Sequence, residues 1–419
     1  MRRPLLLLFI ISLIASLIYT NINVYNKSYN DKDVTIYGIV KEKREKEKYD
    51  EYKIGNFLVR DYAKKNNLII GKKLSVSGKL KSLDSMIYED FDYGRYIKSM
   101  GYEGHLYINY YKVLGENKIY IYLGKIKKYI SNTNKYLYKD KSNFINSILL
   151  GEKEFLSEEE KEMFNRTGTS HVIAISGLHT GIICSIIILL IGNINKIYKL
   201  LILSVLMILY LIMVGFSPSI IRSIAFIVIL YLAFFIDKRR DSISSLSLVG
   251  ILLIINNPYI IYNISFQLSF LSTLSIIYFY GYIKYKLKLS LILLTVCANI
   301  LILPIMYYNF KGIAINSIIS NLIIVPLMSV IIYLSIISVI LFNVSIDISK
   351  TIAYLTKIII NTIYFVLEKI SDFSFSYIEI ENPNFYFVII YYILIFLYMF
   401  YKELKVIKEQ SNELQGYNK

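Results

Sequence analysis

The sequence predicts a polytopic α-helical membrane protein, with about nine or ten transmembrane helices and a small extracytoplasmic β-barrel near the N-terminus. Three observations support this fold class. The 419 residues are 55% hydrophobic, and their mean hydropathy is +0.49. Apolar runs of about 20 residues, the length that crosses a bilayer as a helix, recur along the chain. Residues 20–145 instead form short alternating segments, in which 25 Lys and Arg stand against 15 Asp and Glu.

The first 20 residues are expected to form an N-terminal membrane anchor helix. The segment MRRPLLLLFIISLIASLIY begins with two arginines and continues as an apolar run. No A-x-A-like cleavage site follows, so the segment is interpreted as an uncleaved anchor. Its basic start places the N-terminus in the cytoplasm.

Residues 21–141 are predicted to form an extracytoplasmic OB-like β domain. The segments DVTIYGIVKEK, NFLVRDYA, KKLSVSGKLKSL and HLYINYYKVL alternate polar with apolar or β-branched residues, which is typical of short strands. About five strands would close a small barrel with basic, tyrosine-rich faces. The run KEKREKEKYDEYK at 41–53 is interpreted as a solvated hairpin tip. The basic charge suits nucleic acid, anionic lipid or an acidic wall polymer as a partner, and charge alone does not distinguish among the three.

Residues 142–401 are predicted to form the helical membrane domain, and 402–419 a basic cytoplasmic tail. A polar lead over 142–167 contains a capping box of Ser157 and Glu160. The apolar runs then cover 172–192, 200–214, 220–236, 243–257, 261–281, 289–308, 314–342, 351–370 and 384–401. Charged connectors at 196–199, 237–241 and 284–288 alternate with uncharged turns, so they are expected in the cytoplasm and the β domain outside. The run 314–342 suggests a broken or strongly tilted helix, and 350–370 an interfacial one.

The stretch GTSHVIAISGLHTG at 168–181 is rich in polar side chains for the start of a membrane helix. Ser176 and Thr180 are one helical turn apart, and Gly177 begins a G-xxx-G step that favours close helix packing. Polar groups at membrane depth are expected to face each other or a water-filled cavity, so this helix is predicted to border a hydrophilic passage. His171 and His179 have no third ligand nearby in the sequence, and no metal site is predicted.

Two further polar segments point to the same passage. In GFSPSIIRS at 215–223, Ser217 and Pro218 resemble an N-cap and a first-turn proline, and Arg222 follows about one turn later. A helix N-terminus beside a guanidinium is a ready phosphate site, while snorkelling of Arg222 to lipid headgroups is the alternative. In NISFQLSFLSTLS at 263–275, a serine stripe adjoins Gln267, whose amide needs several partners.

Several function classes find no support in the sequence. There is no G-x-x-x-x-G-K-[ST] pattern, so the chain does not drive transport with its own P-loop ATPase. Three histidines leave no room for a histidine-rich hydrolase site, and no Ser-His-Asp or paired-carboxylate arrangement can be placed. We therefore predict neither an enzymatic activity nor a cofactor.

The succession of polar motifs resembles the ComEC family, the channel of bacterial DNA uptake. The motifs are FNRTGTSHVIAISGLHTG (164–181), GFSPSIIRS (215–223), NNPYIIYNISFQLSFLSTLSII (256–277) and NLIIVPL (321–327). DFDYGRYIKSMGYEGHL (90–106) is similar to the end of the family's OB-like domain. The resemblance runs from about residue 34 to about residue 330. It implies import of single-stranded DNA across the bacterial cytoplasmic membrane during natural transformation.

The resemblance also implies site residues and partners. The channel residues are expected to be Ser170, His171, Ser176, Gly177, His179, Thr180, Ser217, Pro218, Ser219, Arg222, Gln267, Ser269 and Asn321. On the outer domain, the predicted DNA contacts are Arg60, Tyr62, Lys64, Lys65, Lys72 and Lys73, which a solvated basic loop explains equally well. Besides the DNA strand and the lipid bilayer, the implied partners are an outer DNA receptor and a cytosolic helicase-like ATPase. A separate nuclease and self-association are left open.

The sequence departs from the family pattern at both ends. Many members carry a C-terminal β-lactamase-like domain, credited with degrading the strand that is not imported, and this sequence ends about 18 residues after its last apolar run. Nuclease activity is therefore not expected. Members often begin with two or three closely spaced helices, and here one is predicted. The alternatives are a transporter or scaffold for another anionic cargo, such as a lipid or wall precursor, and a channel remnant without uptake function.

Overall fold

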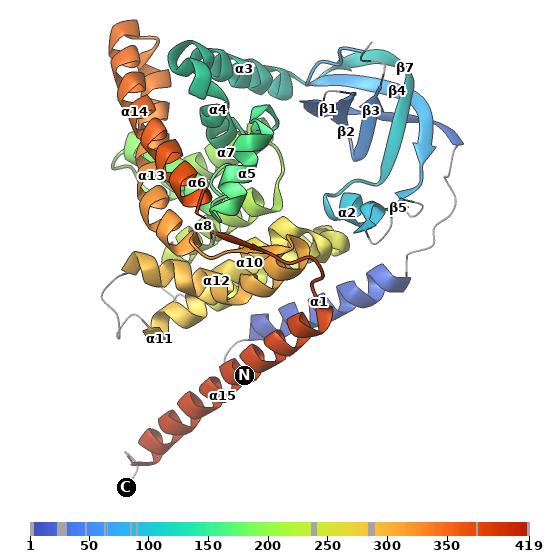
Figure 1. Ribbon diagram of the computed structural model, residues 1–419. Coiled ribbons are helices and arrows are strands. Elements are labelled where there is room, and N and C mark those ends of the chain that lie inside the picture. Colours follow the sequence, from blue (N-terminus) through green and yellow to red (C-terminus); the bar gives the residue numbers. More distant parts are fainter. Residues whose placement is uncertain are drawn as a thin grey trace.

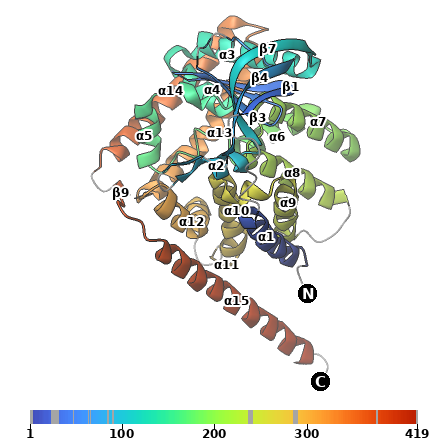
Figure 2. The same ribbon diagram turned by 90° about the vertical axis from the view of Figure 1, so that its right-hand side faces the viewer.

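A β-barrel stands beside a larger helical part in the computed structural model (Figure 1). The structure describes residues 4–22, 32–46, 48–62, 64, 66–83, 86–88, 91–235, 241–283, 290–373 and 376–416. Helix α3 (Lys118–Tyr138) leads from the last barrel strand into the helical part. Figure 2 shows the barrel and α2 (Tyr93–Ser99) in front of the membrane helices.

The barrel confirms the predicted small β domain. Its strands are β1 (Lys32–Glu45), β2 (Asp50–Ile54), β3 (Phe57–Asp61), β4 (Lys72–Lys81) and β7 (Gly104–Glu116). They close in the order β1-β2-β3-β7-β4, and only the β3–β7 pair is parallel. Alternating side chains fill the interior, where Val40, Tyr52, Ile54 and Leu106 are fully buried. At Gly78 a Cβ atom would lie 2.0 Å from the carbonyl oxygen of Tyr107, so this pair of strands requires glycine there.

The barrel is tied to the membrane helices through α2. Short strands β5 (Ile87–Tyr88) and β6 (Phe91–Asp92) precede it, and the carboxylate of Asp92 accepts the backbone N–H of Arg95 at 2.7 Å. At the other end, the amide of Asn257 donates to the carbonyl oxygens of Lys98 and Ser99, at 2.9 and 3.3 Å. The uncharged turn η5 (Pro258–Tyr262) therefore lies on the barrel side of the molecule.

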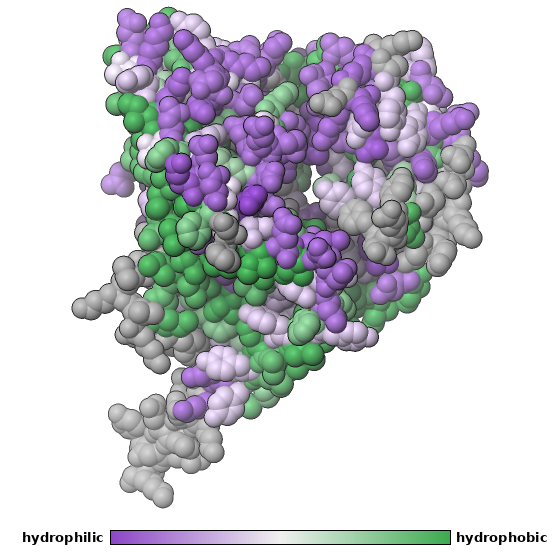
Figure 3. All heavy atoms as spheres, viewed as in Figure 1, coloured by the Kyte–Doolittle hydropathy of each residue, from purple (hydrophilic) through white to green (hydrophobic). Residues whose placement is uncertain are grey.

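Ten apolar helices in the described part of the chain identify a multi-pass membrane protein. Six are long and apolar enough to span a bilayer, and four are shorter. The six contain α1 (Pro4–Ile22), α7 (Lys196–Val214), α12 (Ser290–Asn309), α13 (Ser317–Leu341), α14 (Ile346–Ser371) and α15 (Phe385–Gly416). The shorter ones are α6 (Gly177–Ile191), α8 (Pro218–Phe235), α9 (Ser242–Asn256) and α10 (Ile264–Ser275), which continues into η6 (Ile276–Tyr280). Figure 3 shows a largely hydrophobic surface around these helices and a hydrophilic one around the barrel and α3.

The packing of α1 and α15 places both chain ends on the same side. Helix α1 runs parallel to α9, because Phe9 meets Gly250, and the Ser16 hydroxyl donates to the Pro258 carbonyl at 2.5 Å. Helix α15 runs antiparallel to α12, since its start bonds Tyr307 and its residue Tyr391 bonds the Ile300 carbonyl. Helices α9 and α12 both run toward the barrel side, so the start of α1 and the end of α15 lie away from it (Figure 1).

The polar lead into the membrane domain folds as predicted. It forms α4 (Ser142–Leu150) and α5 (Glu158–Arg166). Ser157 Oγ accepts the Glu160 N–H at 3.1 Å, and the Glu160 carboxylate accepts the Ser157 N–H at 2.9 Å, which confirms the capping box. Phe144 and Phe164 stack on each other and contact Tyr364 of α14 edge-on.

Two details of the sequence interpretation are wrong. The run expected to be helical from residue 172 begins its helix only at Gly177, and 168–176 are irregular. Helix α13 is not broken, the first of the two options expected for 314–342, but continues through Pro326, as membrane helices tolerate when neighbours satisfy the freed carbonyl. The basic run 41–53 forms the predicted hairpin, in which β1 continues to Glu45 and β2 starts at Asp50. The connectors at 237–240 and 284–288 lie outside the described residues.

Candidate functional site

A large cavity with both polar and apolar lining residues lies between the barrel, α3 and the membrane helices. Its volume is about 2560 Å³. Its outer part is lined by β1, β2, α3 and the segment 151–158, and its inner part by α6, α7, α8, α10, α12 and α13. Figure 3 shows the surface hollowed between the barrel and the helical part, with hydrophilic residues on both sides. The cavity therefore connects the outer domain with the interior of the membrane domain.

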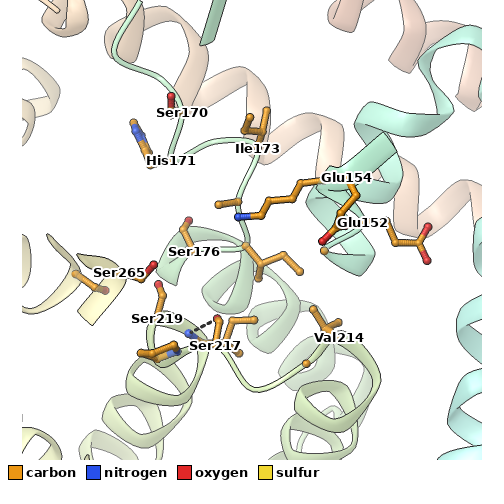
Figure 4. A pocket seen from close by; sticks show the side chains of 18 of the residues that line it. Glu152, Glu154, Ser170, His171, Ile173, Ser176, Val214, Ser217, Ser219 and Ser265 are labelled. Atoms are coloured by element: carbon orange, nitrogen blue, oxygen red, sulfur yellow. Dashed lines mark hydrogen bonds between the residues drawn. The ribbon is translucent and has the colours of Figure 1, made fainter. Parts of the chain in front are cut away.

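Four helices begin at this cavity. Its lining includes Gly177 of α6, Pro218 of α8, Ser265 of α10 and Ser317 of α13, each in the first turn of its helix. Figure 4 shows Ser176, Ser219 and Ser265 close together at three of these starts. The first N–H groups of a helix have no partner within the helix and carry the positive end of its dipole. Four such ends give the cavity wall a preference for anions.

The sequence places these helix starts through local capping. Ser217 accepts the Ile220 N–H at 3.4 Å, which confirms the predicted N-cap before Pro218. Asn263 caps α10 by accepting the Phe266 N–H at 3.2 Å. Capping residues followed by apolar runs thus fix where the helices start, and hence where the cavity lies.

Arg222 is a buried cation without a carboxylate partner. It is 9% exposed, lies about one turn after the start of α8, and lines the cavity. Its Nη1 donates to the Thr273 hydroxyl at 2.6 Å and its Nη2 to the Ser223 hydroxyl at 3.4 Å. Its Nε has no acceptor, and no carboxylate lies within ion-pair distance among the described residues. A buried charge is costly unless an opposite charge reaches it, so the position of Arg222 suits an anionic ligand.

The acidic residues of the lining all lie in the outer part of the cavity. In the described lining they are Glu42, Glu45, Glu152, Glu154 and Glu158. Each has a basic partner within 4 Å, as where Arg44 reaches Glu42 at 3.1 Å and Glu154 at 3.7 Å. Burial raises the pKa of Glu152 and lowers the pKa of Lys127, its partner on α3. Arg222 is the one charged residue that the described membrane helices add to the lining.

Most predicted channel residues line the cavity. These are Ser170, His171, Ser176, Gly177, Ser217, Pro218, Ser219, Arg222, Ser269 and Asn321. The side chain of His171 is exposed within the irregular segment 168–176. Asn321 is 9% exposed, and its Oδ1 has no hydrogen-bond partner among the described residues.

Three predicted channel residues do not line the cavity, and local hydrogen bonds explain why. The Nδ1 of His179 accepts the Ser176 N–H at 3.2 Å, so the ring folds back on the helix start and is 1% exposed. The Thr180 hydroxyl donates to the Ser176 and Gly177 carbonyls. The Gln267 amide donates to the Ile261 carbonyl at 2.7 Å. These side chains satisfy the backbone around the site instead of facing its contents.

The described residues among the predicted DNA contacts of the outer domain are not part of the cavity lining. Arg60 pairs with Glu51 at 3.1 Å; burial lowers its pKa, but the neighbouring Tyr93 and Glu51 outweigh burial and the pKa is raised. Tyr62 is 53% exposed and stacks near Tyr107. Lys72 pairs with Glu116 at 3.0 Å, Lys73 is exposed, Lys64 has positive φ, and Lys65 lies outside the described residues. Their contact with DNA stays a prediction.

The sequence reasoning missed two parts of the lining. Thr273, which holds Arg222, follows the serine stripe of α10 but was not included in it. Lysines of α3 line the outer cavity at positions 125, 128 and 135, with Asn132 between them. Their spacings of three, four and three residues place them on one helical face. This pattern could have been recognised in the sequence.

The fold and the site define a class: a multi-pass membrane protein whose outer β-barrel opens onto a basic cavity among its helices. A family model described as "Competence protein" matches residues 148–405. The chain therefore belongs to the competence protein family, and it is a multi-pass protein of the cytoplasmic membrane.

A curated relative agrees with this assignment. The chain is 32% identical over 249 residues to ComE operon protein 3 of Bacillus subtilis (strain 168). The match covers 56% of this chain and 31% of the relative, so the chain spans about a third of that protein. No solved structure matches the chain.

Proposed function

We propose that this chain passes a single DNA strand across the cytoplasmic membrane during natural transformation. The observation that carries the proposal is Arg222, a buried guanidinium that lines the cavity without a carboxylate partner among the described residues. A phosphodiester is the anion that such a site suits, since Arg binds phosphate through charge-assisted hydrogen bonds. Membership of the competence protein family supports DNA as the cargo over a lipid or wall precursor.

The arrangement suits a strand that moves one phosphate at a time. Helix starts of α6, α8, α10 and α13 offer N–H groups and serine hydroxyls, which donate to phosphate oxygens whatever the base sequence. Thr273 and Ser223 each accept one N–H of the Arg222 guanidinium, so a second hydrogen on each Nη remains for the passing phosphate. No base-specific contact is required, which is what a sequence-independent import path needs.

The chain carries no P-loop in its sequence, so the driving force is supplied by a partner. We propose a cytosolic helicase-like ATPase that pulls the strand and an outer receptor that delivers duplex DNA.

The test is uptake of end-labelled duplex DNA into the nuclease-protected cytoplasmic fraction of a competent host. A strain deleted for this gene is compared with one that expresses this chain from a plasmid at the native level. Restored protected label supports the proposal. Label that binds the cell surface but never becomes protected, despite full membrane insertion, would show that the chain carries some other cargo or none.

A further inference from the structure

Seven lysines at the outer cavity have no acidic partner. The five lining carboxylates pair with Lys43, Arg44, Lys127 and Lys161. The lining lysines without an ion pair among the described residues are Lys41, Lys46, Lys53, Lys125, Lys128, Lys135 and Lys153. This charge surplus lies on both sides of the cavity, on the β1–β2 hairpin and on α3 and the segment after α4.

The α3 lysines form a continuous stripe along one side. Lys125, Lys128 and Lys135 occupy one helical face with Asn132, and all three lysines are exposed. The stripe is about ten residues long, so it extends about 15 Å along the helix axis. The stripe is therefore long enough to meet more than one phosphate of an extended strand.

The barrel faces the stripe with cations as well. Lys53 lies over the ring of Tyr102 at 4.9 Å, and burial lowers its pKa despite the opposing effect of Glu42, so its charge is partly desolvated. The hairpin reaches the membrane helices here, because a Cβ atom at Gly215 would lie 3.3 Å from a carboxylate oxygen of Glu42. The gap between hairpin and α3 therefore opens directly onto the helix starts.

We propose that the gap between α3 and the β1–β2 hairpin is the entry site for the phosphodiester backbone of single-stranded DNA, with Lys125, Lys128 and Lys135 as its backbone contacts. This inference rests on the proposed function for the identity of the ligand. It assigns entry to the cavity mouth and not to the barrel face that carries Lys72 and Lys73. The stripe delivers the strand to Arg222 within the same cavity.

The test is salt-dependent binding of fluorescent oligo-dT by the full chain in lipid nanodiscs, measured by anisotropy between 50 and 200 mM salt. The triple variant K125Q/K128Q/K135Q is compared with wild type and with K72Q/K73Q/K79Q, which removes the same charge from the barrel. Each lost phosphate contact lowers the slope of log affinity against log salt by about 0.7, so the α3 variant should lose about 2. At 50 mM salt the affinity of the α3 variant should be lower than that of wild type. The ratio of the wild-type affinity to that of the variant should then be about 20-fold smaller at 200 mM salt.

A reduced slope in the α3 variant, with the barrel variant unchanged, supports the entry site. Equal slopes in all three proteins, loss in the barrel variant instead, or no binding by wild type would overturn it. Protected DNA uptake by the same strains separates the two proposals. If wild type fails to restore uptake while the α3 variant still loses its slope, the import function fails and the entry site stands. Normal uptake by wild type with three equal slopes refutes the entry site alone.

Discussion

Replacing Arg222 with alanine tests the inner anion site most directly. The substitution removes the one charge that the described membrane helices place in the cavity lining, together with the hydrogen bond to Thr273. It leaves no acidic group unpaired, because no carboxylate partners Arg222 among the described residues. The variant is therefore expected to insert and fold, and to lose function only where an anion must be stabilised.

The size of the effect follows from the bond that a passing phosphate would make. A hydrogen bond to a charged group contributes about 1.5–3 kcal/mol, and each 1.4 kcal/mol corresponds to a factor of ten. Losing Arg222 is then expected to slow strand entry by about 10- to 100-fold. In a short uptake assay, little or no protected label would then be detected. Arg222→Lys keeps the charge but not the planar fork held by Thr273 and Ser223, so we expect an intermediate rate.

The assay is the time course of nuclease-protected label, normalised to the amount of each variant in the membrane fraction. Surface-bound label serves as the control for delivery of DNA and should be equal in all strains. Uptake by Arg222→Ala at the wild-type rate would refute the anion-site reasoning. A variant that is absent from the membrane would be replaced by Arg222→Gln, which keeps the volume and hydrogen-bonding capacity without the charge.

Four other substitutions test local features of the fold. Gly177→Leu should abolish import, because even a Cβ atom there lies 3.2 Å from the Ser223 hydroxyl. A Cβ atom at Gly181 meets no atom within 4 Å, so Gly181→Leu should import normally, and equal uptake by both variants would contradict this. Ser157→Ala removes the capping box of α5 and should cost about 1 kcal/mol of stability, seen as a lower thermal midpoint with import retained; an unchanged midpoint would contradict the cap. His105 is fully buried with both ring nitrogens unpartnered, and burial lowers its pKa to about 3. The unfolded chain therefore takes up a proton that the folded barrel does not, so His105 should lower stability by about 1.4 kcal/mol per pH unit as pH drops below about 6.5. Thermal unfolding should show a slope that is steeper by this amount in wild type than in His105→Phe, and equal slopes would contradict it.

Sequence reasoning reached the parts of the site that depend on neighbouring residues. Ser217, Pro218 and Arg222 lie within six positions, so capping rules and helical spacing place them without knowledge of the fold. The barrel was predictable for a similar reason, since strand alternation is a local pattern. His179 shows where this reasoning stops. Its ring was predicted to line the channel. In the structure the backbone before Gly177 is irregular, and the ring accepts the Ser176 N–H instead.

The lysines at the cavity mouth required the tertiary arrangement. The charges of 41–53 suited a solvated tip equally well, and only the approach of the β1–β2 hairpin to Gly215 places Lys41 and Lys53 in the lining. The spacing of Lys125, Lys128 and Lys135 predicts that they share one helical face. The sequence around them does not show that this face lines the cavity. Contacts between segments far apart in sequence are the part that local patterns leave undetermined.

The cavity is lined by lysines at its mouth and by Arg222 in its interior, and the two kinds of cation differ in exposure and in screening by salt. The three α3 lysines at the mouth are exposed, and the Debye length of about 8 Å at physiological salt screens each from a phosphate farther away, so under the proposed function a strand could bind and slide there. At Arg222 the surroundings are buried and contain no competing carboxylate among the described residues, so one phosphate at a time would exchange water for a fixed donor set. Several such arginines in the inner cavity would bind a polyanion more tightly and slow its release. We therefore propose a graded path, with many weak contacts outside and a single strong one inside, that would bind the strand and still release it to a partner that pulls.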